Sequence, residues 1–311
     1  MLRRPPPQTI DDELTLKLPD GRLLGYAEYG DPGGRPVVFF HGWPGSRITG
    51  MSGDAAAKEA GVRLISIERP GFGLSDDHPG RTIAGWPDDV AHAADALGLG
   101  RFSVLGWSGG GPYAAACAWK LADRLDGCVI FAGTGPFDGA VPGRNFADVK
   151  SMLNLAHRRP WVLAPAMTVF AFFLQRFPGR AMQSLFRSMP PADREIFNRP
   201  ERLAMMGRSS QEAFRHGPRG PAQEIRLFTR PWGFDLAGIP MEVHIWQGED
   251  DLQVPMLTAE RMCEAIPRCT LHRIPNAGHF WIIDHWAELF ETLLAAAEGR
   301  AAERGVAEPA D

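Results

Sequence analysis

Short apolar runs alternate with helix-length stretches over most of the chain. Runs of this length, rich in Val, Ile, Leu and Phe and bounded by turn residues, are typical of buried strands. Eight of them predict strands, at residues 14–18, 23–29, 37–40, 62–67, 102–105, 128–131, 241–245 and 269–274. Helices are expected between them, at residues 55–60, 84–97 and 112–119. Alternating strands and helices imply βαβ units, so the predicted fold class is α/β, with a mostly parallel central sheet flanked by helices.

The pattern changes between residues 135 and 235. This segment is rich in Arg, Met, Phe and Pro, and it has helix-length stretches without a convincing strand. We therefore expect a helical insertion at 135–235 in an α/β core formed by residues 1–134 and 236–311. The two ends of the chain, about residues 1–12 and 300–311, are expected to be disordered tails.

One stretch of the insertion, residues 161–177, is apolar enough to suggest a membrane element. It is shorter than the ~20 residues that cross a bilayer, and it contains Pro165. A buried or pocket-lining helix is therefore the preferred interpretation, and no stable membrane insertion is expected.

Composition narrows the class of protein. A length of 311 residues suits one large α/β domain with an insertion, and a net charge of −4 gives no reason to expect a nucleic-acid partner. The N-terminal residues lack the apolar segment of a signal peptide. The cysteines lie inside predicted helices and strands without metal-ligand spacing, so we expect reduced core thiols, no metal and a cytoplasmic location. They are Cys117, Cys128, Cys263 and Cys269.

The sequence GWSGG at residues 106–110 lies between a predicted strand and a predicted helix. A strand that enters a helix through G-x-S-x-G forms a nucleophile elbow, a sharp turn that exposes one serine hydroxyl. Glycines flank the serine because a side chain there would collide across the turn. Ser108 is therefore the candidate nucleophile.

Three further motifs each follow a predicted strand. HGWPG at 41–45 can present backbone N–H groups, GEDDLQVP at 248–255 offers carboxylates, and NAGH at 276–279 ends in a histidine. Together with the elbow, these motifs resemble the α/β-hydrolase superfamily, in its cap-bearing serine hydrolase branch, over residues 14–299. The resemblance implies an α/β-hydrolase fold in which residues 135–235 form a cap over the active site.

The resemblance also implies a catalytic triad in the order serine, acid, histidine. His279 is the expected base, whereas His285 lies in the next helical run. The acid usually stands three residues after the strand-ending glycine and three before a Val-Pro or Ile-Pro pair. Both counts lead to Asp251, with Asp250 as the runner-up and Glu249 as a solvated neighbour.

The remaining site residues follow from the same resemblance. The N–H groups of Trp43 and Gly109 are expected to form the oxyanion hole, and His41 is expected to brace its loop. Apolar side chains are expected to line the substrate pocket, namely Trp107, Trp161, Phe172 and Phe173. Chemistry of this kind requires no metal and no organic cofactor.

Hydrolysis of a small carboxylic ester or lactone through an acyl-enzyme is the preferred function. Serine at the elbow disfavours the relatives that use Asp there, the epoxide hydrolases and haloalkane dehalogenases. Proline iminopeptidases share the HGxPG loop, but their elbow usually reads GGSWG. C–C hydrolases, thioesterases, hydroxynitrile lyases and cofactor-free oxygenases remain open, as does a ligand receptor that keeps this fold. Either a monomer or a homodimer is compatible with the sequence.

The predicted cap is basic although the whole chain is acidic. Between residues 135 and 235, fourteen arginines and one lysine stand against four aspartates and four glutamates. These arginines either face water as ordinary surface residues or form a rim that attracts anionic substrates.

Overall fold

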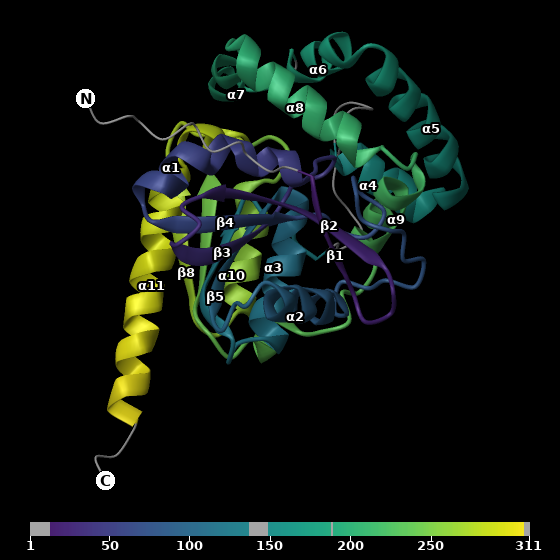
Figure 1. Ribbon diagram of the computed structural model, residues 1–311. Helices are drawn as coiled ribbons and strands as arrows, with labels where there is room; N and C mark the ends of the chain where they lie inside the picture. Colours follow the sequence, from purple (N-terminus) through teal and green to yellow (C-terminus); the bar gives the residue numbers. More distant parts are fainter. Residues whose placement is uncertain (1–12, 137–148, 188, 308–311) are drawn as a thin grey trace, which may run out of the picture.

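A computed structural model describes residues 13–136, 149–187 and 189–307 (Figure 1). Its centre is an eight-stranded sheet of order β1-β2-β4-β3-β5-β6-β7-β8. Strand β2 runs antiparallel to both of its neighbours, and all other pairs are parallel. The strands are β1 Leu14–Lys17, β2 Leu23–Gly30, β3 Arg35–Phe40, β4 Val62–Ile67, β5 Phe102–Trp107, β6 Leu125–Phe131, β7 Val243–Gly248 and β8 Cys269–Ile274. The α/β fold class is thus confirmed.

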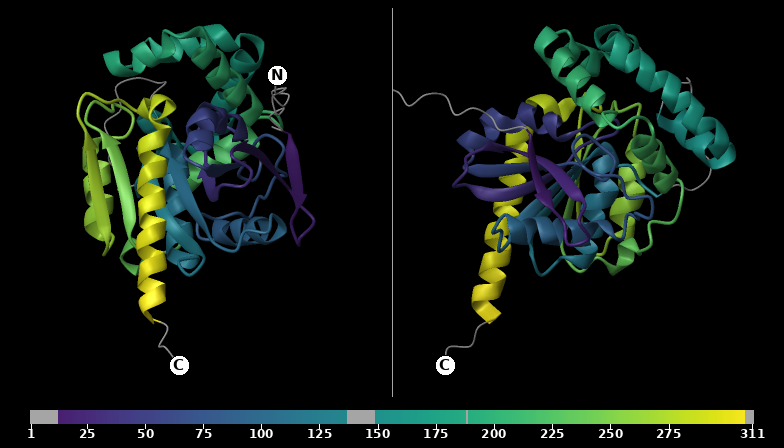
Figure 2. Two further views of the ribbon diagram at one scale, coloured as in Figure 1. Left: turned by 60° about the vertical axis from the view of Figure 1, so that its left-hand side comes forward. Right: turned by 45° about the vertical axis from the view of Figure 1, so that its right-hand side comes forward.

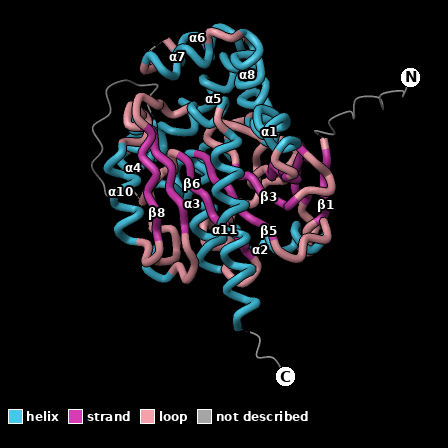
Figure 3. The backbone as a smooth tube through the Cα atoms, turned by 90° about the vertical axis from the view of Figure 1, so that its left-hand side faces the viewer, coloured by secondary structure: helices cyan, strands magenta, loops and turns pink. Residues whose placement is uncertain are grey.

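Helices cover both faces of this sheet (Figures 2 and 3). Helices α1 (Asp54–Glu59) and α11 (Trp286–Ala307) pack on one face. Helices α2 (Trp86–Ala96), α3 (Gly111–Lys120) and α10 (Met256–Ala265) pack on the other. Because the central strands are covered on both faces, they are continuously apolar; every residue of β5 is buried.

A helical layer lies beyond the carboxyl ends of the parallel strands (Figure 1). Its helices separate β6 from β7 in the sequence, where the helical insertion is expected. They are α4 Val149–Arg158, α5 Pro160–Arg176, α6 Pro178–Phe186, α7 Pro191–Phe197, α8 Pro200–Ala213 and α9 Arg219–Phe228. We call this layer the cap. It faces the strand ends that carry the four motifs.

The prediction of a disordered C-terminal tail from about residue 300 is wrong for most of that segment. Helix α11 continues to Ala307, and its last turns extend past the sheet in Figure 1. Residues 301–304 of this helix are exposed, so they carry no apolar stripe that periodicity could detect. The N-terminal tail predicted at 1–12 lies outside the described residues.

The cysteine prediction is also wrong in part. Cys263 in α10 and Cys269 at the start of β8 form a disulfide, whereas Cys117 and Cys128 are buried free thiols, as expected. The short loop between α10 and β8 brings the paired residues to a Cα–Cα distance of 5.3 Å. Four reduced thiols were part of the argument for a cytoplasmic location, so that prediction loses this support.

Within the described ranges, no single helix has the length and apolar character needed to cross a membrane. The segments Trp161–Arg176 and Pro178–Phe186 would meet that requirement only as a pair, and they meet at a bend of 115°.

Candidate active site

Ser108 occupies a tight turn between β5 and α3. Its φ of 53° lies in the left-handed region, where a residue with a side chain is strained. The flanking glycines permit the turn, because a Cβ on Gly106 would lie 2.5 Å from the carbonyl oxygen of Gly110. A Cβ on Gly110 would in turn lie 2.0 Å from the carbonyl oxygen of Phe40. The predicted elbow geometry is therefore present.

His279 and Asp251 form a buried pair beneath the turn. His279 Nδ1 lies 2.7 Å from Asp251 Oδ2. The other carboxylate oxygen accepts hydrogen bonds from the backbone N–H groups of Gln253 and Val254, at 2.7 and 2.9 Å. Gln247 donates its amide to Oδ2 at 3.0 Å. Asp251 thus has a full set of donors, and it holds His279 in one orientation.

The neighbouring acids lie elsewhere. Glu249 and Asp250 are exposed, whereas Asp251 is buried. His285 stands outside this pair and contacts Glu288. Of the three residues that the motif spacing selects as a triad, His279 and Asp251 are paired, and Ser108 lines the same cavity as His279.

Electrostatics favour a charged His279 despite its burial. Burial opposes the imidazolium, but the negative charge and hydrogen bond of Asp251 outweigh it, with a further contribution from Asp193. The pKa of His279 is therefore raised above its usual value. A base with a raised pKa takes up a proton readily as a nucleophile is deprotonated.

The candidate oxyanion donors lie close together. A Cβ built on Gly109 would lie 3.3 Å from the backbone nitrogen of Trp43. Neither N–H donates to another residue in the described part of the chain. His41 Nδ1 lies 2.8 Å from the carbonyl oxygen of Gly42, which matches the expected bracing of this loop. Two backbone N–H groups without another acceptor in the described residues therefore lie close together, one of them on the residue next to Ser108.

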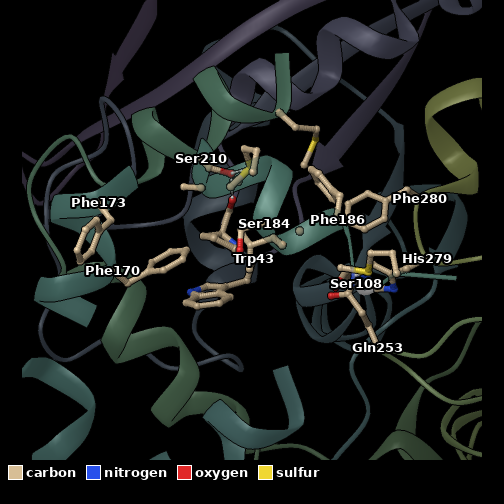
Figure 4. Close-up of a pocket in the computed structure, with 18 of the residues that line it drawn as sticks. Trp43, Ser108, Phe170, Phe173, Ser184, Phe186, Ser210, Gln253, His279 and Phe280 are labelled. Carbon is tan, nitrogen blue, oxygen red and sulfur yellow. Dashed lines mark hydrogen bonds between the residues drawn. The ribbon is translucent and has the colours of Figure 1, made fainter. Parts of the chain in front are cut away.

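A cavity of about 720 Å³ opens in front of these groups, between the core and the cap (Figure 4). Ser108 and His279 lie at one end of it, and Phe170 and Phe173 lie at the other. The lining is mostly apolar. Among the described residues that line the cavity, the only charged or titratable side chains are those of His279 and Arg180.

The comparisons with known proteins agree with this architecture. A model of the alpha/beta hydrolase family matches residues 37–292. The chain belongs to this family. It is 25% identical over 280 residues to a 2-hydroxymuconate semialdehyde hydrolase of Pseudomonas putida, covering 85% of this chain and 89% of that protein.

Solved structures of the same fold include an esterase from Exiguobacterium antarcticum, with a TM-score of 0.68 and 20% identity. That match covers 92% of this chain and 99% of the esterase. An enol-lactonase from Burkholderia xenovorans matches with a TM-score of 0.66 and 18% identity, over 91% and 99% of the two chains. The family match thus supports hydrolytic chemistry for this chain, and each relative named here is itself named for a hydrolytic activity.

The predicted pocket residues divide into two groups. Trp107 and Phe173 line the cavity, and the Trp107 indole also donates to the carbonyl oxygen of His279 at 3.1 Å. Trp161 and Phe172 do not line it and are 69% and 63% exposed. The expectation that those two side chains bind substrate is wrong, because they project from the opposite side of α5.

Asp193, on the cap helix α7, was not anticipated from the sequence. Its side chain is fully buried and accepts the backbone N–H groups of His279 and Phe280, at 3.1 and 2.9 Å. A Cβ on Gly278 would lie 2.3 Å from Asp193 Oδ1, so the glycine before the histidine makes room for this carboxylate. In this alpha/beta hydrolase the cap therefore holds the loop of the candidate base.

A second buried contact joins the cap to the oxyanion loop. Arg69 donates to Glu224 of α9 through Nε, at 2.5 Å, and to the carbonyl oxygen of His41, at 2.8 Å. Trp43 Nε1 donates to the carbonyl oxygen of Pro221, also in α9, at 3.0 Å. Both candidate catalytic loops are thus bound to cap helices as well as to the core.

In the ranges that the structure describes, no group of three or more His, Cys, Asp and Glu side chains could hold a metal ion.

Proposed function

We propose that this alpha/beta hydrolase cleaves carboxylic esters or lactones with an apolar acyl group through a serine acyl-enzyme. The main supporting observation is the position of Ser108, on a strained turn at the end of an apolar cavity that it shares with His279, whose partner is Asp251. An acyl chain can extend from Ser108 toward Phe170 and Phe173.

The geometry suggests the order of bond changes. Ser108 Oγ attacks the carbonyl carbon while its proton passes to His279 Nε2, and Asp251 stabilises the resulting imidazolium. The oxyanion accepts hydrogen bonds from the N–H groups of Trp43 and Gly109, each worth about 3–4 kcal/mol of barrier. The C–O bond then breaks and His279 protonates the leaving alkoxide. Water then attacks the acyl carbon and gives a proton to His279. The bond to Ser108 Oγ breaks, His279 returns the proton to Oγ, and the acid leaves.

The cavity lining disfavours the aminopeptidase alternative. A substrate with a free amino terminus carries an ammonium group, and burying this charge requires a carboxylate partner. No Asp or Glu lies among the described residues that line the cavity, whose one permanently charged side chain is the cation Arg180. An apolar ester therefore suits the cavity better than an aminoacyl substrate.

Chain-length preference tests this proposal. We expect kcat/KM for p-nitrophenyl esters to rise about tenfold or more from acetate to hexanoate, because each buried methylene contributes up to ~0.8 kcal/mol. Prolyl and alanyl p-nitroanilides should not be turned over. The measurement is steady-state release of p-nitrophenol or p-nitroaniline.

Two results would contradict the proposal. Faster cleavage of the anilides than of any ester would favour an aminopeptidase, and a single slow turnover on every ester would favour a receptor.

The pH profile tests the role of Asp193. Because the pKa of His279 is raised and its neutral form is the base, kcat/KM should fall as the pH drops through a value above 6.5. Asp193→Asn removes a negative charge that favours the imidazolium and raises the pKa of His279, so the acid limb should move to lower pH. Because one loop hydrogen bond is lost, kcat should also fall about tenfold.

The matched control is Glu195→Gln, which removes an exposed carboxylate from the same helix. It should leave both the pH profile and kcat unchanged. An acid limb that stays in place in Asp193→Asn would mean that Asp193 only stabilises the fold.

A further inference from the structure

Helix α5 carries large apolar side chains on its outward face. Trp161, Val169 and Phe172 are spaced by three to eight residues and so lie along one side of the helix. Together with Phe173 and Phe177 they are 40–69% exposed. We call these five side chains the α5 patch. Helix α5 itself lies at the edge of the cap in Figure 1.

The α5 patch is unusual for a cap helix. The opposite side of α5 is also apolar, and Leu163, Met167 and Leu174 are buried there. A surface helix with one apolar face in the core normally turns a polar face to solvent. Of the eight large exposed hydrophobic residues in the described part of the chain, five belong to this patch. Such a concentration marks an interaction surface.

The charge around the patch has one sign. Residues 149–192 contain six Lys and Arg side chains and no Asp or Glu. The exposed Arg158 and Arg159 precede α5, Arg176 ends the helix beside Phe177, and Arg180 follows the patch. No ion pair joins these four arginines to a carboxylate of the described residues. The guanidinium of Arg176 lies 5.0 Å from the ring centre of Phe177. The surface is therefore apolar with a cationic border.

The patch adjoins the cavity. Val169, Phe173, Phe177 and Arg180 are exposed and also line it. In Figure 4, Phe173 lies far from Ser108. A partner that binds the α5 patch would therefore contact the end of the cavity that lies farthest from Ser108.

We propose that the α5 patch docks the protein on an anionic lipid bilayer. The aromatic side chains would enter the boundary between headgroups and acyl chains, and the arginines would meet lipid phosphates. Tryptophan and arginine both favour this interface. The docked cap would present the cavity to acyl chains in the bilayer.

A second copy of the chain fits the patch less well. In a two-fold dimer the same surfaces meet, so the arginines of one copy would approach those of the other. The segment offers no acidic residue to compensate them. Spanning the bilayer is also disfavoured, because α5 and α6 bend by 115° and bury Met182 and Phe186 against the protein. Docking on the bilayer surface pairs the arginines with anionic lipids and leaves Met182 and Phe186 buried in the protein.

Vesicle flotation tests the proposal, on the wild type and on Ser108→Ala so that binding is read independently of hydrolysis. The wild type should float with phosphatidylcholine vesicles that contain about 30% phosphatidylglycerol, and less as salt is added. The double variant Trp161→Ser/Phe172→Ser should lower the bound fraction about tenfold. Its activity on a soluble ester should be unchanged, because neither side chain lines the cavity. Arg158→Gln/Arg159→Gln should weaken binding several-fold.

The control is Leu257→Ser, which removes an exposed apolar side chain of α10, at 53% exposure, and should bind like the wild type. Three results would overturn the proposal. They are absence of flotation with anionic vesicles, equal flotation with pure phosphatidylcholine, and a double variant that floats like the wild type. A dimer in sedimentation velocity that the double variant dissociates would assign the patch to a second copy instead.

Discussion

Replacing Ser108 with alanine should lower kcat on p-nitrophenyl esters by about 10⁵-fold or more, because the variant lacks the proposed nucleophile. Binding should persist, since the apolar cavity is unchanged apart from one oxygen. The measurement is kcat and KM at enzyme concentrations high enough to detect residual turnover.

Covalent labelling provides an independent readout. An organophosphonate or sulfonyl fluoride should add once per chain, and mass spectrometry should locate the adduct on Ser108. Ser184 and Ser210 line the same cavity and serve as controls, so Ser184→Ala should stay within about twofold of the wild type. Labelling of either serine, or near-full activity of Ser108→Ala, would refute the assignment of the nucleophile.

Asp251→Asn should lower kcat by about 10⁴-fold, because an amide beside His279 Nδ1 favours the wrong tautomer and cannot stabilise the imidazolium. Asp250→Asn and Glu249→Gln should change kcat by less than about twofold, since both side chains are exposed and lie outside the pair. The three variants carry comparable changes in charge, so the comparison isolates position. The thermal unfolding temperature of each variant should be measured alongside the kinetics. Asp251 also accepts hydrogen bonds from two backbone N–H groups, so its replacement can lower stability as well as kcat.

If Asp250→Asn lowered kcat most of the three, with folding intact, Asp251 would not be the catalytic acid. Both the motif spacing and the contact between His279 and Asp251 would then have indicated the wrong residue. Equal losses in all three would indicate a general effect of charge and would contradict a specific role for Asp251.

The candidate triad could be predicted because each of its members depends on local chain geometry. The elbow needs glycine at 106 because a Cβ there would meet the carbonyl oxygen of Gly110, four residues later. Asp251 follows β7 by three residues, and its backbone partners are the next residues along the chain. Such short-range constraints leave a pattern in the sequence. The alternation of strands and helices likewise predicted the sheet and its helical layers.

The cap contacts could not be predicted in this way. Asp193 bonds to the N–H group of His279 across 86 residues, and Arg69 bonds to Glu224 across 155. Contacts between such distant positions have no periodicity, and a single buried carboxylate resembles a surface one in the sequence. The disulfide required knowledge of where Cys263 and Cys269 lie relative to each other.

The sequence alone determined the class of fold, the order of the catalytic motifs and the presence of an apolar, basic insertion, because these depend on local sterics and on composition. Only the tertiary structure decided which side of that insertion faces the cavity. Helix α5 is apolar on both sides, so its periodicity cannot separate Phe170, on the cavity, from Trp161 and Phe172, which face outward. Packing against the rest of the protein buries one side of α5. The side that stays exposed forms the α5 patch, for which we propose a membrane partner.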